Sequence, residues 1–123
     1  MNSKNTKLGP IVVDILGKKL TDDDIRRIQH PMTGGVILFG RNFESRVQIT
    51  ALVKSIHALR DDLLISVDHE GGRVQRFKTD GFTHLPAMRT LGALFEKNPL
   101  KAVQVTTATG YVLAAELRAV GVD

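Results

Sequence analysis

The chain has 123 residues, of which 42% are hydrophobic and 24% charged, a composition typical of at most one ordinary domain with a core. Its formal net charge of +4 comes from scattered basic residues, and few aromatic side chains are present, so nucleic-acid binding is weakly supported. There is no apolar run long enough for a membrane helix, no cysteine and no secretory signal near Met1, so the cytoplasm is the expected compartment.

The first elements alternate between apolar runs and helix signals. Residues 10–16 form a nearly unbroken apolar run rich in β-branched side chains, which predicts a strand buried on both faces. Thr21, followed by three Asp residues, predicts the start of a helix that reaches about His30, before Pro31. A second buried strand is predicted at residues 35–39.

The same alternation continues through the middle of the chain. From Ser45, apolar residues recur at helical spacing to about Arg60, which predicts an amphipathic helix. Residues 63–67 predict a third strand that leads directly into Asp68. Because buried strands alternate with helices, we expect parallel pairing with right-handed crossovers.

The last part begins with an irregular connection. After Asp68 we expect a loop of about 30 residues, and long loops inside compact domains are usually functional. The Asn-Pro pair at residues 98–99 predicts the start of a helix that runs to residue 120, with Gly121 as its C-terminal cap. Residues 122–123 then resemble the opening of a fourth strand. A sheet edge left unpaired there makes truncation of a longer domain the simplest expectation.

Candidate functional side chains follow the predicted strands. In a parallel barrel of strands and helices, working residues lie at the C-terminal ends of strands and in the loops that follow. Asp14, the pair Arg41-Asn42 and the cluster beginning at Asp68 occupy such places, so we expect them to share one rim. Asp14 can equally fix the rim through backbone amides, and Arg41 and Asn42 can simply shape the turn.

The most polar group of residues lies from Asp68 to Phe77, in the string Asp-His-Glu-Gly-Gly-Arg-Val-Gln-Arg-Phe. A carboxylate at a buried strand end needs donors, which paired sugar hydroxyls supply, and Arg73 and Arg76 donate in fixed geometry. The glycines at 71–72 permit unusual torsions and let the chain pass near a ligand, and Phe77 is expected to anchor the loop. A structural ion pair and a simple turn are the alternatives.

The other titratable residues give weaker signals. Glu70 is a potential acid or base, although the favoured interpretation is that it holds Arg73 or a loop amide. His69, beside Asp68, is ambiguous. The remaining histidines show no metal-ligand spacing: His30, His57 and His84.

The sequence resembles the β-N-acetylhexosaminidases of glycoside hydrolase family 3, bacterial enzymes of cell-wall recycling. The resemblance rests on residues 9–10 (Gly-Pro), on residues 35–43 (Gly-Val-Ile-Leu-Phe-Gly-Arg-Asn-Phe) and on residues 68–77. Weaker matches lie at residues 85–86 and 115–117. Together these segments span nearly the whole chain in the expected order, and the string at 68–77 is long and specific.

The resemblance implies an α/β fold, the N-terminal part of a (β/α)8 TIM-type barrel, with about three βα units and the start of a fourth strand. Residues 1–123 would then be a partial domain. The implied substrate carries a non-reducing terminal N-acetylglucosamine, typically on anhydromuramoyl peptide, and no cofactor or metal is implied. Asp68 and Arg76 match the family's substrate-binding Asp and Arg, whereas Arg73 is expected to be structural. His69 stands where the family commonly shows Gln.

The catalytic residues implied by the resemblance do not occur in the chain. Family members use a retaining mechanism with a covalent glycosyl intermediate, a downstream Asp nucleophile and an acid/base His after a Lys-His-Phe-Pro-Gly-His-Gly-like motif. We therefore assign no catalytic residue and expect a truncated β-N-acetylglucosaminidase that is inactive alone. A non-catalytic sugar-binding module or partner-dependent fragment is the alternative, and a phosphosugar-binding barrel enzyme is a weaker one. The oligomeric state stays open.

Overall fold

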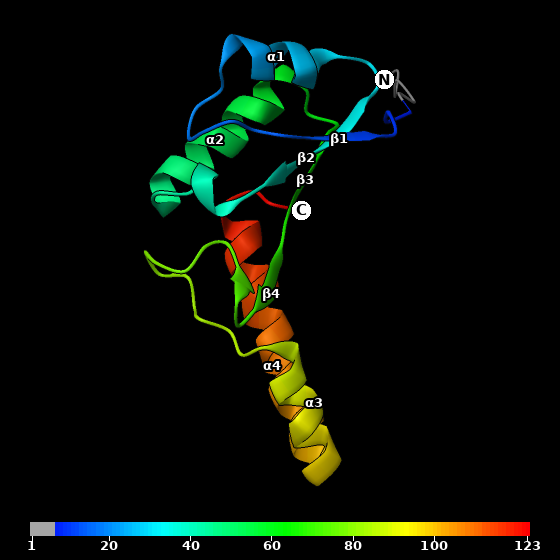
Figure 1. Cartoon of the computed structure of the whole chain (residues 1–123), viewed down its shortest axis with the longest axis vertical. Helices are drawn as coiled ribbons and strands as arrows, with labels where there is room; N and C mark the ends of the chain where they lie inside the picture. Colours follow the sequence, from blue (N-terminus) through cyan, green and yellow to red (C-terminus); the bar gives the residue numbers. More distant parts are fainter. Residues whose placement is uncertain (1–6) are drawn as a thin grey trace, which may run out of the picture.

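Three strands of the first half of the chain form one parallel sheet. The computed structural model describes residues 7–123. The strands lie side by side in chain order: β1 (Ile11–Asp14), β2 (Thr33–Leu38) and β3 (Leu64–Val67). The helix α1 (Asp22–Gln29) connects β1 to β2, and the helix α2 (Arg46–Leu59) connects β2 to β3, as Figure 1 shows. The predicted alternation of strands and helices with parallel pairing is confirmed.

Local hydrogen bonds explain where α1 begins. The Thr21 hydroxyl accepts a hydrogen bond from Asp24 N at 3.2 Å, and the Asp24 carboxylate accepts one from Thr21 N at 2.9 Å, which is a capping box. Asp24 is buried, and it also pairs with Arg27 at 2.6 Å. Burial alone would raise the pKa of Asp24, but hydrogen bonds from Thr21 and Leu16 and the charge of Arg27 hold that pKa below its usual value. The predicted helix start is confirmed.

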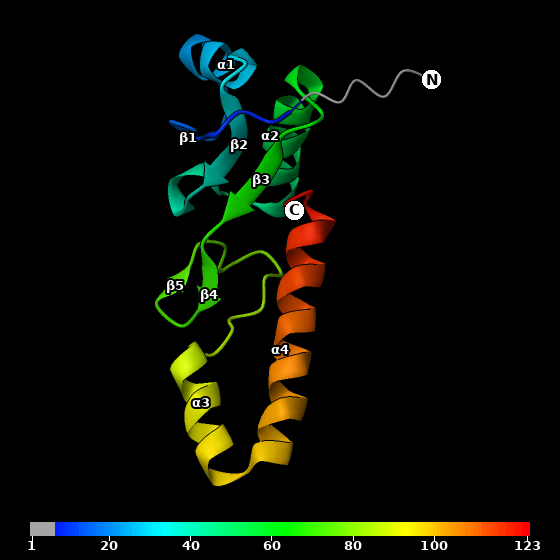
Figure 2. The ribbon, with the colours of Figure 1, turned by 90° about the vertical axis from the view of Figure 1, so that its right-hand side faces the viewer.

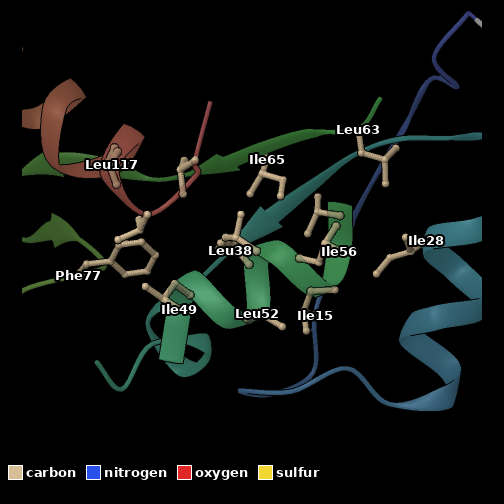
Figure 3. Close-up of a cluster of buried hydrophobic side chains, with 14 of the residues drawn as sticks. Ile15, Ile28, Leu38, Ile49, Leu52, Ile56, Leu63, Ile65, Phe77 and Leu117 are labelled. Carbon is tan, nitrogen blue, oxygen red and sulfur yellow. The ribbon is translucent and has the colours of Figure 1, made fainter. Parts of the chain in front are cut away.

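The hydrophobic core lies between the sheet and the helices α1 and α2, and Figure 3 shows its side chains. Side chains alternate along a strand, so Val36, Leu38 and Ile65 share the covered face and are buried. The helix α2 contributes apolar residues at helical spacing: Ile49, Leu52, Val53 and Ile56. Burying one such side chain stabilises the fold by about 1.5–3 kcal/mol, so this face accounts for the association of the sheet with its helices.

The opposite face of the sheet is not covered by the described residues. Val12, Gly35 and Leu64 are in register across the three strands, and Val12 and Leu64 are 59% and 58% exposed. The prediction that residues 10–16 form a strand buried on both faces is therefore wrong for the described part of the chain. An apolar run indicates that both faces can be buried, but it does not identify the elements that cover them.

The connection after Asp68 is not the long irregular loop that the sequence predicts. It contains an antiparallel hairpin of β4 (His69–Gly71) and β5 (Val74–Gln75), followed by the helix α3 (Met88–Lys97). Strands this short cannot show the alternation of apolar and polar residues that identifies a strand. The helix α3 begins after Ala87 without a side-chain cap, so the usual start signal is missing.

The helix α4 (Pro99–Ala119) follows α3 directly, and both form a helical hairpin that projects from the sheet (Figure 2). The Asn98 side chain accepts a hydrogen bond from Lys101 N at 3.0 Å, which confirms the predicted Asn-Pro start. Gly121 has a φ of 91° directly after the helix, which confirms its predicted capping role. Within residues 7–123 there is no helix with the length and apolar character needed to cross a membrane.

Asp123 lies beside β3. Its backbone N donates to Ile65 O at 3.0 Å, and its carboxylate accepts from Ile65 N at 2.9 Å. The opposite edge of β3 pairs with β2. Residues 122–123 therefore occupy the place where a fourth strand would pair, as the sequence predicts.

Candidate sugar-binding site

The carboxyl ends of the parallel strands carry the residues singled out in the sequence. Asp14 is the last residue of β1, Phe39 follows β2, and Asp68 follows β3. The carboxyl ends of parallel strands lie at one edge of a sheet, and this edge is where barrel enzymes bind their ligands. The structure thus places Asp14 and Asp68 on the shared rim that was expected.

Asp68 and Arg76 form an ion pair across the base of the β4–β5 hairpin. Arg76 Nη2 donates to Asp68 Oδ2 at 3.1 Å. His69 pairs with Gln75 in the hairpin, so Asp68 and Arg76 occupy the adjacent position, on the side of β3. Their side chains are 44% and 32% exposed, and an ion pair this open contributes only about 0–1 kcal/mol to stability. The pair therefore contributes little to the stability of the fold.

The Phe39 ring gives Arg76 a second contact. Arg76 Cζ lies 5.6 Å from the ring centroid, and Arg41 Cζ lies 4.8 Å from it. A guanidinium within about 6 Å of an aromatic centroid is attracted by the electrons of the ring. Arg76 is thus oriented by the Asp68 carboxylate and by the Phe39 ring.

The side chains at the other strand ends have structural partners. Asp14 pairs with Arg27 at 3.3 Å and with Arg41. Asn42 is fully buried and donates to Ile15 O at 2.9 Å and Gly17 O at 2.7 Å, while its own oxygen accepts from the backbone N of the residue after β2. Asn42 therefore shapes the turn after β2, which was one of the two interpretations left open by the sequence.

The glycines of the hairpin face the chain itself. Gly71 and Gly72 have φ values of 87° and 57°, a region that favours glycine. A Cβ on Gly71 would lie 2.3 Å from Pro86 O, and one on Gly72 would lie 2.8 Å from Ala87 Cβ. The unusual torsions that the sequence predicts are present, but the close neighbour of both residues is the segment before α3.

Gln75, which the sequence did not single out, joins the hairpin to the segment that follows. Its side-chain nitrogen donates to Phe77 O at 2.9 Å and Thr83 O at 2.8 Å, and its oxygen accepts from Leu85 N at 2.9 Å. Phe77 is fully buried and stacks on Phe43 with centroids 4.8 Å apart, which agrees with its predicted role as an anchor. A buried glutamine has no sequence signature of its own, because the backbone groups that it satisfies are defined only by the fold.

His69 is buried on the core side of the hairpin, with its ring near Phe77 and Phe82. Within residues 7–123 neither ring nitrogen has a hydrogen-bond partner. Burial lowers the pKa of His69, and the negative charge of Glu116 partly opposes this shift. The histidine that was ambiguous in the sequence is therefore a neutral residue of the core.

Glu70 and Arg73 do not behave as expected. Both are exposed, and within residues 7–123 they form no ion pair with each other and Glu70 forms no side-chain hydrogen bond. The interpretation that Glu70 holds Arg73 or a loop amide is wrong. The same part of the chain contains no group of three or more His, Asp or Glu residues arranged to hold a metal ion.

Comparison with known proteins identifies the family. Residues 2–123 match the sequence model of the glycosyl hydrolase family 3 N terminal domain. The chain belongs to glycosyl hydrolase family 3. A beta-hexosaminidase of Bordetella avium is 64% identical over 116 residues, and one of Methylobacillus flagellatus is 58% identical over 117. Each comparison covers 94% of this chain and 33% of the relative, so the chain spans about a third of the length of these family 3 relatives.

Two solved structures share the fold. NagZ from Neisseria gonorrhoeae in complex with N-trifluoroacetyl-D-glucosamine is 45% identical, with a TM-score of 0.88 over 94% of this chain and 34% of that one. A family 3 β-N-acetylglucosaminidase from Paenibacillus is 28% identical, with a TM-score of 0.79 over 100% of this chain and 23% of that one. The predicted α/β fold, the N-terminal part of a TIM-type barrel, is confirmed, as is the resemblance to the N-terminal portion of a family 3 β-N-acetylhexosaminidase.

Proposed function

We propose that the protein is a β-N-acetylglucosaminidase, a glycoside hydrolase that removes a non-reducing terminal N-acetylglucosamine, and that Asp68 and Arg76 bind this sugar. The observation that carries the proposal is the half-exposed Asp68–Arg76 pair at the carboxyl end of a parallel sheet in a family 3 chain. The similar NagZ structure from Neisseria gonorrhoeae, whose ligand is N-trifluoroacetyl-D-glucosamine, supports a sugar of this kind.

The chemistry of the pair suits neighbouring sugar hydroxyls. Arg76 engages only Oδ2 of Asp68, and within residues 7–123 Oδ1 accepts no hydrogen bond. Arg76 Nε is buried and also lacks a partner there. A hydroxyl group both donates and accepts, so one hydroxyl can donate to the Asp68 carboxylate while its neighbour accepts from the Arg76 guanidinium. The bond between the two side chains keeps them oriented when no sugar is bound.

We assign no catalytic role to a residue of this chain. Retaining hydrolysis needs a nucleophile and a separate acid/base, and the resemblance implies motifs for both that these 123 residues do not contain. We therefore propose that residues 1–123 are a partial barrel domain that supplies one wall of the site and hydrolyses little or nothing alone. The exposed apolar face at Val12 and Leu64 supports poor stability of these residues in isolation.

The finer proposal concerns the substrate. The proposed substrate is an N-acetylglucosamine attached to anhydromuramoyl peptide, which the enzyme would process in the cytoplasm during cell-wall recycling. The motif at residues 68–77 alone supports this proposal.

A second function is a sugar-binding module without hydrolase activity, or a fragment that depends on a partner. It is favoured by the fact that Asp68 and Arg76 are already oriented within the described residues, by the hairpin and by Phe39. Such a module would bind N-acetylglucosamine and leave its glycosides intact.

Calorimetry with N-acetylglucosamine tests the role of the pair. We expect binding by the purified protein that is lost in Asp68→Ala and weakened at least tenfold in Arg76→Lys, because lysine lacks the planar fork of donors. Glu70→Gln is the matched control, since Glu70 is a nearby exposed carboxylate that has no side-chain partner among residues 7–123. Equal binding in all four proteins would remove Asp68 and Arg76 from the site.

Turnover of a chromogenic N-acetylglucosaminide separates the two functions. Binding with turnover in a protein that carries this chain within a full-length barrel would establish the hydrolase, and binding without turnover would establish the module. Turnover by the 123-residue chain alone, above a mock preparation, would refute our assignment of catalysis to other residues. Circular dichroism of each protein must show a folded chain, so that absent binding is not mistaken for an absent site.

A further inference from the structure

A histidine at position 69 is energetically unfavourable for the folded protein. The residue is 5% exposed, and the centroid of its ring lies 5.8 Å from that of Phe77 and 6.0 Å from that of Phe82. Neither ring nitrogen has a hydrogen-bond partner within residues 7–123. A buried polar group left without a partner costs about 1–3 kcal/mol, so an apolar side chain would pack there more favourably. Packing alone therefore does not account for a histidine beside these rings.

The place of His69 in the hairpin connects it to the candidate site. His69 lies opposite Gln75, and the next residues along the two strands are Asp68 and Arg76, which form the ion pair. Side chains alternate along a strand, so His69 and Gln75 face the core while Asp68 and Arg76 lie on the other side of the hairpin, partly exposed. Because the two pairs share the same short stretch of backbone, a displacement of the His69 ring shifts the residues that carry the ion pair.

A proton on His69 would create a buried charge without adequate compensation. Gln75 is neutral, and its side chain already bonds to three backbone groups. The charged group that acts on the ring is Glu116 of α4, but its two oxygens accept hydrogen bonds from Thr83 N and Oγ1 at 2.9 and 2.6 Å. Burial outweighs Glu116, so the pKa of His69 is lowered. Protonation thus favours conformations in which the ring leaves the core and reaches water.

We propose that His69 is a positioning residue for the Asp68–Arg76 pair, and that it holds this pair in its sugar-binding geometry only while its ring is uncharged. The proposal rests on the sugar-binding role proposed above for Asp68 and Arg76. When the ring is neutral it packs on Phe77 and the hairpin is fixed. When the ring is protonated the hairpin loses this support, and sugar affinity falls.

The first test is the pH dependence of N-acetylglucosamine affinity, measured by calorimetry from about pH 5 to about pH 8, the range in which histidine titrates. We compare the unmodified protein with His69→Phe and His69→Gln, which carry no ionisable ring. His84→Gln is the matched control, because His84 is exposed in the same connection. We expect affinity to fall about tenfold in acid for the unmodified protein and the control, and by less than about twofold for both His69 variants. Parallel profiles in all four proteins would overturn the proposal.

A second measurement does not need the sugar. The NMR signal of Arg76 Nε–H reports whether this buried Nε atom keeps its packed environment, and we follow its chemical shift over the same pH range. We expect the signal to move in acid toward the chemical shift of a free arginine side chain in the unmodified protein, and to keep its position in His69→Phe, or in His69→Gln if the first variant does not fold. If this occurs but no sugar binds at any pH, the proposed function fails and the positioning role stands. If the signal changes neither with pH nor on substitution of His69, the positioning role fails even where sugar binds.

Discussion

The Glu116 carboxylate on α4 accepts two hydrogen bonds from Thr83, one from its backbone N at 2.9 Å and one from its hydroxyl at 2.6 Å. These bonds attach the segment after the hairpin to the long helix. Glu116→Gln keeps the shape but lets only one side-chain oxygen accept, so we expect a loss of about 1 kcal/mol in the free energy of unfolding. Urea denaturation measures this loss, with Glu96→Gln on the exposed surface of α3 as the control. An equal effect of both substitutions would contradict a specific role for Glu116.

Phe39→Leu removes the ring that faces Arg76 while keeping an apolar side chain. We expect N-acetylglucosamine affinity to fall about two- to fivefold, because a partly exposed cation–π contact contributes about 0.5–1 kcal/mol. Calorimetry measures the change. Phe95→Leu removes a ring that is 54% exposed on α3, away from the strand ends, and should leave affinity unchanged. Unchanged affinity in Phe39→Leu would show that Asp68 alone orients Arg76.

Gly71→Ala places a Cβ only 2.3 Å from Pro86 O at a φ of 87°. The backbone strain alone costs about 1–3 kcal/mol, and the segment before α3 must also move, so we expect a destabilised hairpin and no sugar binding. Gly92→Ala is the opposite case, because Gly92 lies within α3 and its added Cβ meets nothing within 4 Å. That variant should gain about 0.5–1 kcal/mol of stability in thermal unfolding. A stable, sugar-binding Gly71→Ala protein would mean that the hairpin tolerates rearrangement.

Asn42→Ala removes three hydrogen bonds to backbone groups. Within residues 7–123, Gly17 O and Phe39 N then lose their side-chain partner, while Ile15 O keeps its bond from Arg41 Nε at 3.2 Å. Because Asn42 is fully buried, we expect a loss of about 2–3 kcal/mol in the free energy of unfolding. Asn98→Ala removes an exposed helix cap and should cost about 1 kcal/mol. Denaturant unfolding ranks the two variants, and a larger loss for Asn98 would contradict the structural role of Asn42.

The lowered pKa of Asp24 predicts a stability that depends on pH. The folded protein binds the Asp24 proton less tightly than the unfolded chain, so the stabilisation is fully present above the ordinary value of 3.8 and is lost as pH falls below it. Asp24→Asn should therefore be less stable than the unmodified protein at neutral pH, and the difference should narrow in acid. Unfolding measured at several pH values checks this, with Asp22→Asn, an exposed neighbour, as the control.

Several elements were predictable because their signals are local. Thr21 and Asn98 each place a side-chain oxygen over free helix amides, so both helix starts follow from a few neighbouring residues. The placement of Asp68 also followed, since an apolar strand that ends in a carboxylate fixes both the strand and its polar end. Its role as a sugar ligand stays a prediction.

Other features depend on residues far apart in the chain. The prediction that β1 is buried on both faces was wrong, because the burial of Val12 depends on elements far away in the chain. Short β4 and β5 left no periodic pattern, and the α3 start at Ala87 has no cap to signal it. Gln75 could not be identified because its partners, Phe77, Thr83 and Leu85, become neighbours only when the segment folds back.

The three hydrogen bonds of Gln75 have a consequence for how this part of the molecule opens. Gly72 N donates to Leu85 O at 2.8 Å, Leu85 N donates to Gln75, and Thr83 is bound to α4, so these amides share one set of contacts. Breaking one contact exposes the next, and groups linked in this way exchange their amide hydrogens as a cooperative unit. The protection of Gly72 and Leu85 from exchange should therefore rise and fall together. Sugar bound at Asp68 and Arg76 should slow exchange at Thr83, although Thr83 lies in a different segment of the chain.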